Sequence, residues 1–139
     1  MANEAVIVEL LGRGGEPVDF VVADATAIEK GTICNLTGTR ETSGASTVPA
    51  DLVAGIAAAE KEASDGATNL ALHQTGIFDL RATTGAAIRA GQKVRLSGAN
   101  IITGIIGDQD MSKGYIVGTA LEDTAAGTPE TIEVDIGLR

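Results

Sequence analysis

The sequence predicts an all-β protein that folds as a compact barrel-like or sandwich domain. Apolar and polar residues alternate cleanly in Glu133–Ile136 and in part in Val6–Leu10, and a period of two places successive side chains on opposite faces of a strand. Clusters rich in Gly, Pro, Asp and Ser separate the alternating segments, as in Ser64–Gly66 and Ala126–Pro129. Strands spaced about 8–12 residues apart with such turns between them are typical of sandwiches and barrels.

Alternation or β-branched content supports ten strands along the chain. In order they are Glu4–Leu11, Val18–Ala23, Thr32–Leu36, Leu52–Glu60, Asn69–Gln74, Ile77–Arg81, Lys93–Leu96, Ile101–Ile105, Tyr115–Glu122 and Thr131–Ile136. The Ala-rich segment Ala57–Ser64 has the composition of a helix. We expect a strand running into a turn there instead, because Leu52–Ile56 leads into it without a capping residue.

One short helical turn is expected at about Gly85–Ala90. Thr84 is suited to cap its start, and Gly91 is suited to end it.

A weak internal repeat suggests two related β units. Ile28–Leu36 resembles Ile88–Leu96, with an Ile, a Gly three residues later and a Leu five residues after that. Leu52–Ala57 resembles Tyr115–Ala120. The first pair lies 60 residues apart (88 − 28) and the second 63 (115 − 52). Duplication would produce this pattern, and so would chance similarity in a chain rich in Gly and Ala.

The glycines of the repeat have a conformational interpretation. Gly31 and Gly91 each precede a strand, where a positive φ would turn the chain sharply into it. Gly55 and Gly118 stand inside strands, which indicates bulges or the close approach of another backbone.

Length and composition indicate one domain with a modest core. The chain of 139 residues fits a single β domain, residues 18–139, preceded by an N-terminal strand or arm, residues 1–17. Aromatic residues make up only 2% of a chain that is 44% hydrophobic, so individual core residues bury little area. Assembly with other subunits would compensate for such a core.

The charge of −9 argues against nucleic acid and anionic membrane surfaces as partners, because their phosphates would repel the protein. Cys34 is the only cysteine, so a disulfide framework within the chain is ruled out. The N-terminus lacks the pattern of a secretory signal, and no stretch approaches the roughly 18 apolar residues of a membrane span. We therefore expect synthesis in a cytoplasm.

Possible catalytic and metal-binding residues are few. His73, the only histidine, alternates with Leu70 and Leu72 and is therefore expected on the exposed face of its strand. Cys34 is expected to be a small buried residue rather than a reactive thiol. Asp108 and Asp110 are interpreted as part of a solvated turn. We expect no catalytic residues, no cofactor and no metal.

The segment Gly76–Leu96 carries a resemblance to a known family. Its pattern Gly-Ile-Phe-Asp-Leu, then Ala-Thr-Thr-Gly-Ala-Ala-Ile, then Ala-Gly-Gln-Lys-Val resembles the signature of the small capsid decoration, or cement, proteins of tailed bacteriophages. Ile116–Ala120 is similar to a later strand of that family, and Gly31–Leu36 and Val53–Ala57 to earlier ones. The resemblance covers about Ile28 to Arg139.

The resemblance implies a β domain that forms homotrimers on the outer surface of an icosahedral head. Its partners would be the major capsid protein and other copies of itself, and it would stabilise the expanded capsid lattice. Its place would be the virion, after synthesis in the host cytoplasm. The alternative function is a carbohydrate- or host-surface-binding β module of a head fibre or adhesin, although such modules present exposed aromatic residues that this chain lacks.

Two sets of residues are singled out by this reasoning. The N-terminal segment is apolar and precedes a Gly-rich stretch, so it is either an arm that adds a strand to a neighbouring sheet or an ordinary first strand. Its candidate contact residues are Val6, Ile7, Val8, Leu10 and Leu11. The residues expected to be architectural are Gly31, Gly55, Phe78, Leu80, Thr84, Gly85, Ile88, Gly91, Val94 and Gly118.

Overall fold

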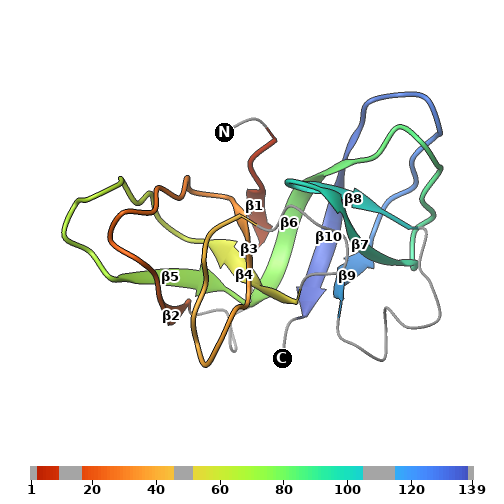
Figure 1. Ribbon diagram of the computed structural model, residues 1–139. Helices are drawn as coiled ribbons and strands as arrows, with labels where there is room; N and C mark the ends of the chain where they lie inside the picture. Colours follow the sequence, from red (N-terminus) through yellow and green to blue (C-terminus); the bar gives the residue numbers. More distant parts are fainter. Residues whose placement is uncertain (1–2, 10–16, 46–51, 105–114, 138–139) are drawn as a thin grey trace.

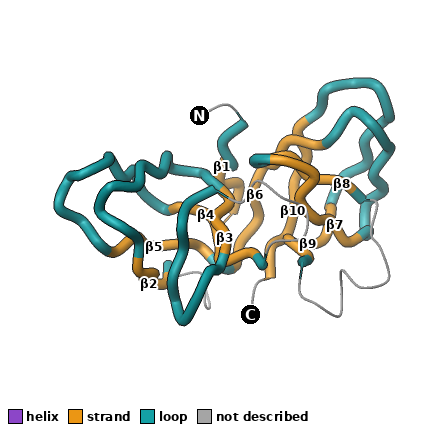
Figure 2. Tube along the Cα trace, viewed as in Figure 1, coloured by secondary structure: helices purple, strands orange, loops and turns teal. Residues whose placement is uncertain are grey.

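The computed structural model describes residues 3–9, 17–45, 52–104 and 115–137. These residues form ten strands in two sheets and include no helix (Figures 1 and 2). The all-β prediction is therefore confirmed, and each predicted strand overlaps one strand of the structure. The strands are β1 (Val6–Glu9), β2 (Val18–Val21), β3 (Ile33–Asn35), β4 (Val53–Ala57), β5 (Asn69–His73), β6 (Thr75–Ala82), β7 (Lys93–Gly98), β8 (Ile101–Thr103), β9 (Ile116–Ala120) and β10 (Thr131–Gly137).

The two sheets lie side by side (Figure 1). One has the strand order β2-β5-β4-β3. The other has the order β1-β6-β10-β9-β7-β8, and an additional parallel pairing of β6 with β8 curls it toward a barrel. Only Gln74 separates β5 from β6, so the chain passes directly from the first sheet into the second.

The structure shows that the internal repeat is a duplication of the fold. The order β2-β5-β4-β3 of the first unit matches the order β6-β10-β9-β7 of the second. In the first unit Cys34 faces Gly55, with a break in register before Asn35. In the second unit Val94 faces Gly118, with the same break before Arg95. The predicted bulges therefore occur at equivalent places.

Loop hydrogen bonds repeat in the same way. The amide of Gly31 donates to Ala57 O at 2.9 Å, and the amide of Gly91 donates to Ala120 O at 2.7 Å. Ser64 donates to Asp24 O, and its equivalent Gly127 donates to Thr84 O, each at 2.7 Å. The bonds of Ser64 and Gly127 lie outside the segments whose sequences match, and chance similarity within those segments does not account for them. The two-unit interpretation is therefore confirmed.

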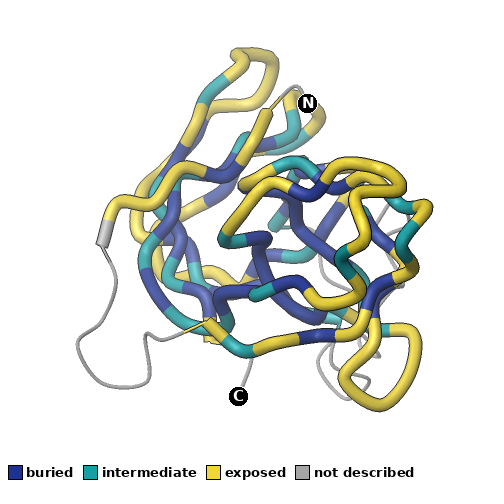
Figure 3. Tube along the Cα trace, turned by 90° about the vertical axis from the view of Figure 1, so that its left-hand side faces the viewer, coloured by how far each residue is buried: buried dark blue, intermediate teal, exposed yellow. Residues whose placement is uncertain are grey.

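Each unit has its own apolar core, and every residue of the first core has an equivalent in the second, larger core. The core of the first unit consists of Phe20, Val22, Ile28, Cys34, Ala54, Ala57, Leu70 and Leu72. The equivalent residues Leu80, Ala82, Ile88, Val94, Val117, Ala120, Ile132 and Val134 all belong to the core of the second unit. That second core also includes Ala5, Ile33 and Ile56, which come from outside the unit. The interface between the units is thus an extension of the second core. Figure 3 shows buried backbone passing through the middle of the molecule, with the exposed residues mainly on the outer loops.

The helical turn predicted at about Gly85–Ala90 is wrong. The chain bends at residues 84–86, and Ile88 then forms a bridge with Thr124. Thr83 rather than Thr84 caps the bend, because its Oγ1 accepts a hydrogen bond from the Gly85 amide at 3.3 Å. The amide and carbonyl of Ile88 both bond to Thr124, which leaves no backbone groups there for a helix.

Candidate interaction surface

The N-terminal strand β1 presents an apolar edge. Among the strands that the structure describes, it pairs with β6 alone, with Val6 facing Asp79 and Ile7 facing Phe78, and it lies at the end of the strand order. The exposed fractions of Val6, Ile7 and Val8 are 57%, 39% and 42%, so side chains on both faces of the strand reach solvent. Apolar edge strands left uncovered favour pairing with another chain.

The segment before β1 is held firmly against the body of the protein. The Ala5 amide donates to Gly31 O at 2.8 Å, and Asn100 Nδ2 donates to Asn3 O at 3.1 Å. An open hollow of about 470 Å³ lies beside it, lined by Glu4, Ala5, Val6, Ile7 and Lys30. The segment that leads into β1 is therefore hydrogen-bonded to the rest of the protein, and the hollow lies beside it.

Of the five candidate contact residues, the structure describes three. Val6, Ile7 and Val8 lie together on β1. Leu10 and Leu11 lie outside the described residues.

The architectural candidates occupy the interior and the turns. Phe78, Leu80, Ile88 and Val94 are at most 1% exposed. Gly31 and Gly91 have φ values of 85° and 91°, as expected for glycines that turn into a strand. A Cβ on Gly55 would lie 2.6 Å from His73 O, and one on Gly118 would meet Asp135 O, so both positions require glycine because a neighbouring backbone approaches closely.

The placement predicted for His73 is wrong. The residue is only 5% exposed, and its ring lies 5.5 Å from that of Phe78. Alternation put it on the outer face of β5, but that face is covered because the second unit packs against it.

Cys34 is buried, as predicted. Burial raises the pKa of its thiol to about 12, so the thiolate that would act as a nucleophile or metal ligand is scarcely populated near neutral pH.

The described residues contain no cluster of three or more His, Cys, Asp or Glu side chains that could hold a metal ion. Asp108 and Asp110 lie outside the described residues. A helix that could span a membrane is not found in the part of the chain that the structure describes.

Sequence reasoning missed one residue that organises this region. Asn100, in the turn between β7 and β8, is fully buried with a φ of 55°. Its Oδ1 accepts the Ile33 amide at 2.8 Å, and its Nδ2 donates to Gly31 O at 2.8 Å. It therefore joins the second unit to the first and to the N-terminal segment. The available signal was its place after Gly98-Ala99, because Asn tolerates the left-handed conformation of such a turn.

The fold and the surface define a class of protein: a duplicated all-β domain that exposes an apolar strand edge. The comparison with protein families makes the class specific. A family model described as phage cement protein matches residues 12–136, which is most of the chain. The chain therefore belongs to the phage cement protein family, and the resemblance found in Gly76–Leu96 is confirmed. No curated protein sequence matches the chain.

Proposed function

We propose that this protein decorates the outer surface of the icosahedral head of a tailed bacteriophage and stabilises the expanded lattice of the major capsid protein. The observation that supports this function most strongly is the match to the cement protein family over residues 12–136. Its site of action is the virion, after synthesis in the host cytoplasm, and its second partner is itself, as a homotrimer.

The mechanism is linkage between binding and capsid maturation. A ligand that binds one state of a two-state assembly and not the other stabilises the bound state by mass action. Many copies on one shell add avidity without a strong individual contact. A net charge of −9 favours solubility and keeps the protein away from nucleic acid until it meets a complementary surface.

The contact surface we assign to the capsid is the exposed edge of β1. Within the described residues β6 pairs with one edge of β1, and Val6, Ile7 and Val8 are exposed, so they can receive an added strand of a capsid subunit. Strand addition supplies affinity through main-chain hydrogen bonds and specificity through side-chain pockets, and the hollow lined by Ala5, Ile7 and Lys30 provides such a pocket.

The test is to mix the purified protein with undecorated expanded heads and with unexpanded precursor heads. Cryo-electron microscopy is expected to show regular density outside the expanded shell only, together with a higher temperature of head disruption. Expanded heads without added density would contradict the proposal. Binding to a glycan array without binding to heads would support the alternative of a carbohydrate-binding module.

The role of β1 is tested with Val8→Lys, and Leu121→Lys serves as the control. These two residues have similar exposed fractions, 42% and 43%, so each variant should fold normally. Val8→Lys is expected to weaken binding to heads at least about tenfold, because it places a charge on the added-strand interface. Equal head binding by both variants would exclude β1 as the contact.

A further inference from the structure

The contact between the two units joins two turns. Asn100, at the turn between β7 and β8 of the second unit, bonds to Gly31 O and to the Ile33 amide in the turn that leads into β3 of the first unit. All three residues are buried. We call the first turn the head of a unit and the second its tail, so within one chain the head of the second unit binds the tail of the first.

The duplication supplies a second head and a second tail, and both are exposed. The equivalent of Asn100 is Arg40, 60 residues earlier (100 − 40), which has the same left-handed backbone, with φ 52°. The equivalents of Gly31 and Ile33 are Gly91 and Lys93. Arg40, Gly91 and Lys93 are all exposed. No atom of the described residues lies within 4 Å of a Cβ placed on Gly91, whereas a Cβ placed on Gly31 would meet Ala5 O at 2.7 Å.

The free head and the free tail have complementary chemistry. Arg40 uses Nε and Nη2 to donate to Asp19 O at 3.2 and 2.8 Å, and a guanidinium has five N–H donors in all. It can therefore also donate to a carbonyl such as Gly91 O, as Asn100 donates to Gly31 O.

The residues beside the two turns reinforce this complementarity. Inside the chain, the positions next to the turns hold two isoleucines, Ile101 on the head and Ile33 on the tail. Their equivalents are Glu41 on the free head and Lys93 on the free tail, both exposed. Two apolar residues are thus replaced by residues of opposite charge, which suits a contact that forms between soluble molecules.

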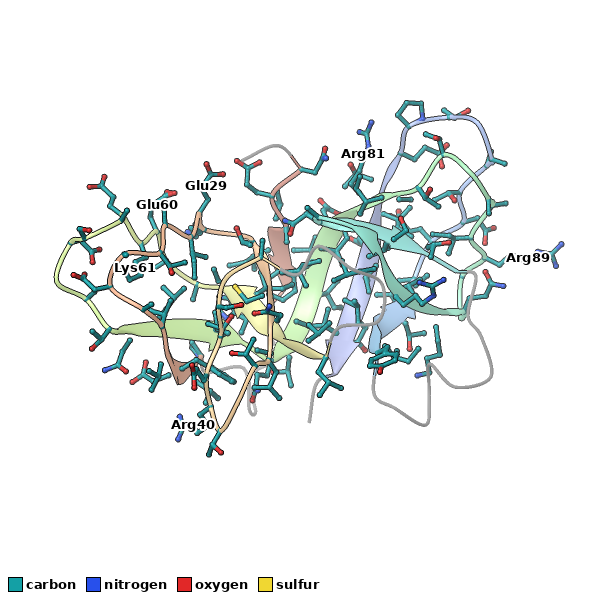
Figure 4. The ribbon with its side chains drawn as sticks, viewed as in Figure 1. Glu29, Arg40, Glu60, Lys61, Arg81 and Arg89 are labelled. Carbon is teal, nitrogen blue, oxygen red and sulfur yellow. The ribbon has the colours of Figure 1, made fainter. Side chains whose placement is uncertain are left out.

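The free head and the free tail belong to different units and project in different directions. Figure 4 shows Arg40 projecting from the first unit and Arg89, which begins the free tail, projecting from the far side of the second. One chain cannot bring them together, but two chains can. A contact between different surfaces of identical molecules propagates from copy to copy and closes into a ring when the rotation allows.

We propose that copies of this protein associate head to tail, with the turn Thr37–Glu41 of one copy bound to the turn Arg89–Lys93 of the next. Arg40 bonds to Gly91 O, and Glu41 pairs with Lys93. Lys93 Nζ already donates to Thr119 Oγ1 at 2.8 Å, and an ammonium has two further protons for the carboxylate. This inference rests on the self-association included in the proposed function and adds the surfaces that carry it.

The test is a charge exchange. Glu41→Lys and Lys93→Glu are each expected to weaken self-association at least about tenfold, because each places like charges opposite one another. The double variant restores an opposite pair and is expected to recover the mass of the wild-type oligomer. Glu62→Lys, which changes an exposed acidic residue in a distant loop, is the control for net charge and should leave the mass unchanged. The measurement is multi-angle light scattering over a range of protein and salt concentrations.

The outcomes separate this contact from the decoration function. A wild-type protein that stays monomeric at every concentration, single variants that keep the wild-type mass, or a double variant that fails to recover it would each overturn the head-to-tail contact. Binding of the same samples to expanded phage capsids is measured at saturating concentration. Single variants that are monomeric yet still bind expanded phage capsids support the head-to-tail contact and leave the decoration function intact. A wild-type protein that does not bind the capsids contradicts the decoration function alone.

Discussion

The two units have one backbone plan and two different outer faces. In the first unit Ile56 pairs with Ile33 on one side and His73 on the other, and all three are buried. In the second unit Thr119 pairs with Lys93 and Asp135 in the same register, and these residues are exposed or half-buried. The inward residues and the glycines are common to both units and determine the fold. The outward residues differ because a neighbouring unit covers only the first face.

The largest difference in stability should come from introducing a lysine at equivalent positions of the two outer faces, in two separate variants. Ile56→Lys buries an ammonium in the interface and should cost at least about 4 kcal/mol of unfolding free energy. Thr119→Lys, at the equivalent position, places the charge between Asp135 and Lys93 and should change stability by less than about 1 kcal/mol. Chemical denaturation of both variants measures the difference, and similar losses would show that the two faces are equally covered.

The second comparison concerns the two turns. Asn100→Ala leaves the buried Ile33 amide without its acceptor and should cost about 3 kcal/mol. Arg40→Ala removes an exposed side chain and should cost less than about 1 kcal/mol. Both positions have a positive φ, so the backbone penalty of alanine enters both measurements. Urea unfolding at one low protein concentration provides the test. A larger loss of stability in Arg40→Ala than in Asn100→Ala would contradict the assignment of Asn100 as the residue that joins the units.

The third comparison separates backbone strain from crowding. Gly31→Ala and Gly91→Ala both force alanine into the left-handed region, which costs about 1–2 kcal/mol. Only at Gly31 does the new Cβ also meet the N-terminal segment, 2.9 Å from Glu4 Cβ. We therefore expect Gly31→Ala to lose at least about 1 kcal/mol more than Gly91→Ala and to increase hydrogen exchange at the Ala5 amide. Equal losses and unchanged exchange would mean that the segment does not press on this turn.

The smallest effect is a pH dependence that arises from one carboxyl group of the first unit. A hydrogen bond from the Ala67 amide, and then the neighbouring Lys61 ammonium, lower the pKa of Asp65 below 3.8. A carboxyl whose pKa is lower in the folded state stabilises the fold above its unfolded pKa, and this contribution is lost as the pH falls through the folded pKa. The position equivalent to Asp65 in the second unit is Thr128, which does not titrate.

Asp65→Asn should therefore flatten the loss of thermal stability between neutral pH and pH values below 3.8. Melting curves of the variant and of the wild type over that range provide the measurement. Parallel pH profiles would show that other carboxyl groups account for the acid sensitivity.

The sequence predicted the strands well because strand formation depends on neighbouring residues. Alternation and turn residues located all ten strands, and the repeat of Ile28–Leu36 in Ile88–Leu96 indicated the duplication. His73 was misplaced because alternation defines two faces of a strand but does not say what covers each. The helical turn failed because Ile88 bonds to Thr124, a partner 36 residues away.

The residues that join the units could not be predicted from local patterns. Asn100 bonds to residues 67 and 69 positions away in the sequence. Lys61 stands between two glutamates in the sequence, yet it is only 3% exposed, and its ammonium donates to Asp24 O at 2.8 Å. Side chains of this kind are identified only when the fold has brought distant segments together.

The dependence of the first unit on Asn100 has a consequence for synthesis on the ribosome. The strands β2 to β5 leave the exit tunnel before Asn100 does, so the first unit emerges with Ile33 and Ile56 uncovered and the Ile33 amide unpaired. Exposed apolar surface and unpaired strand edges make such nascent species prone to aggregation. The second unit is therefore synthesised later and buries the apolar face of the first. A chain cut short before Asn100 should be insoluble even though it contains every strand of the first sheet.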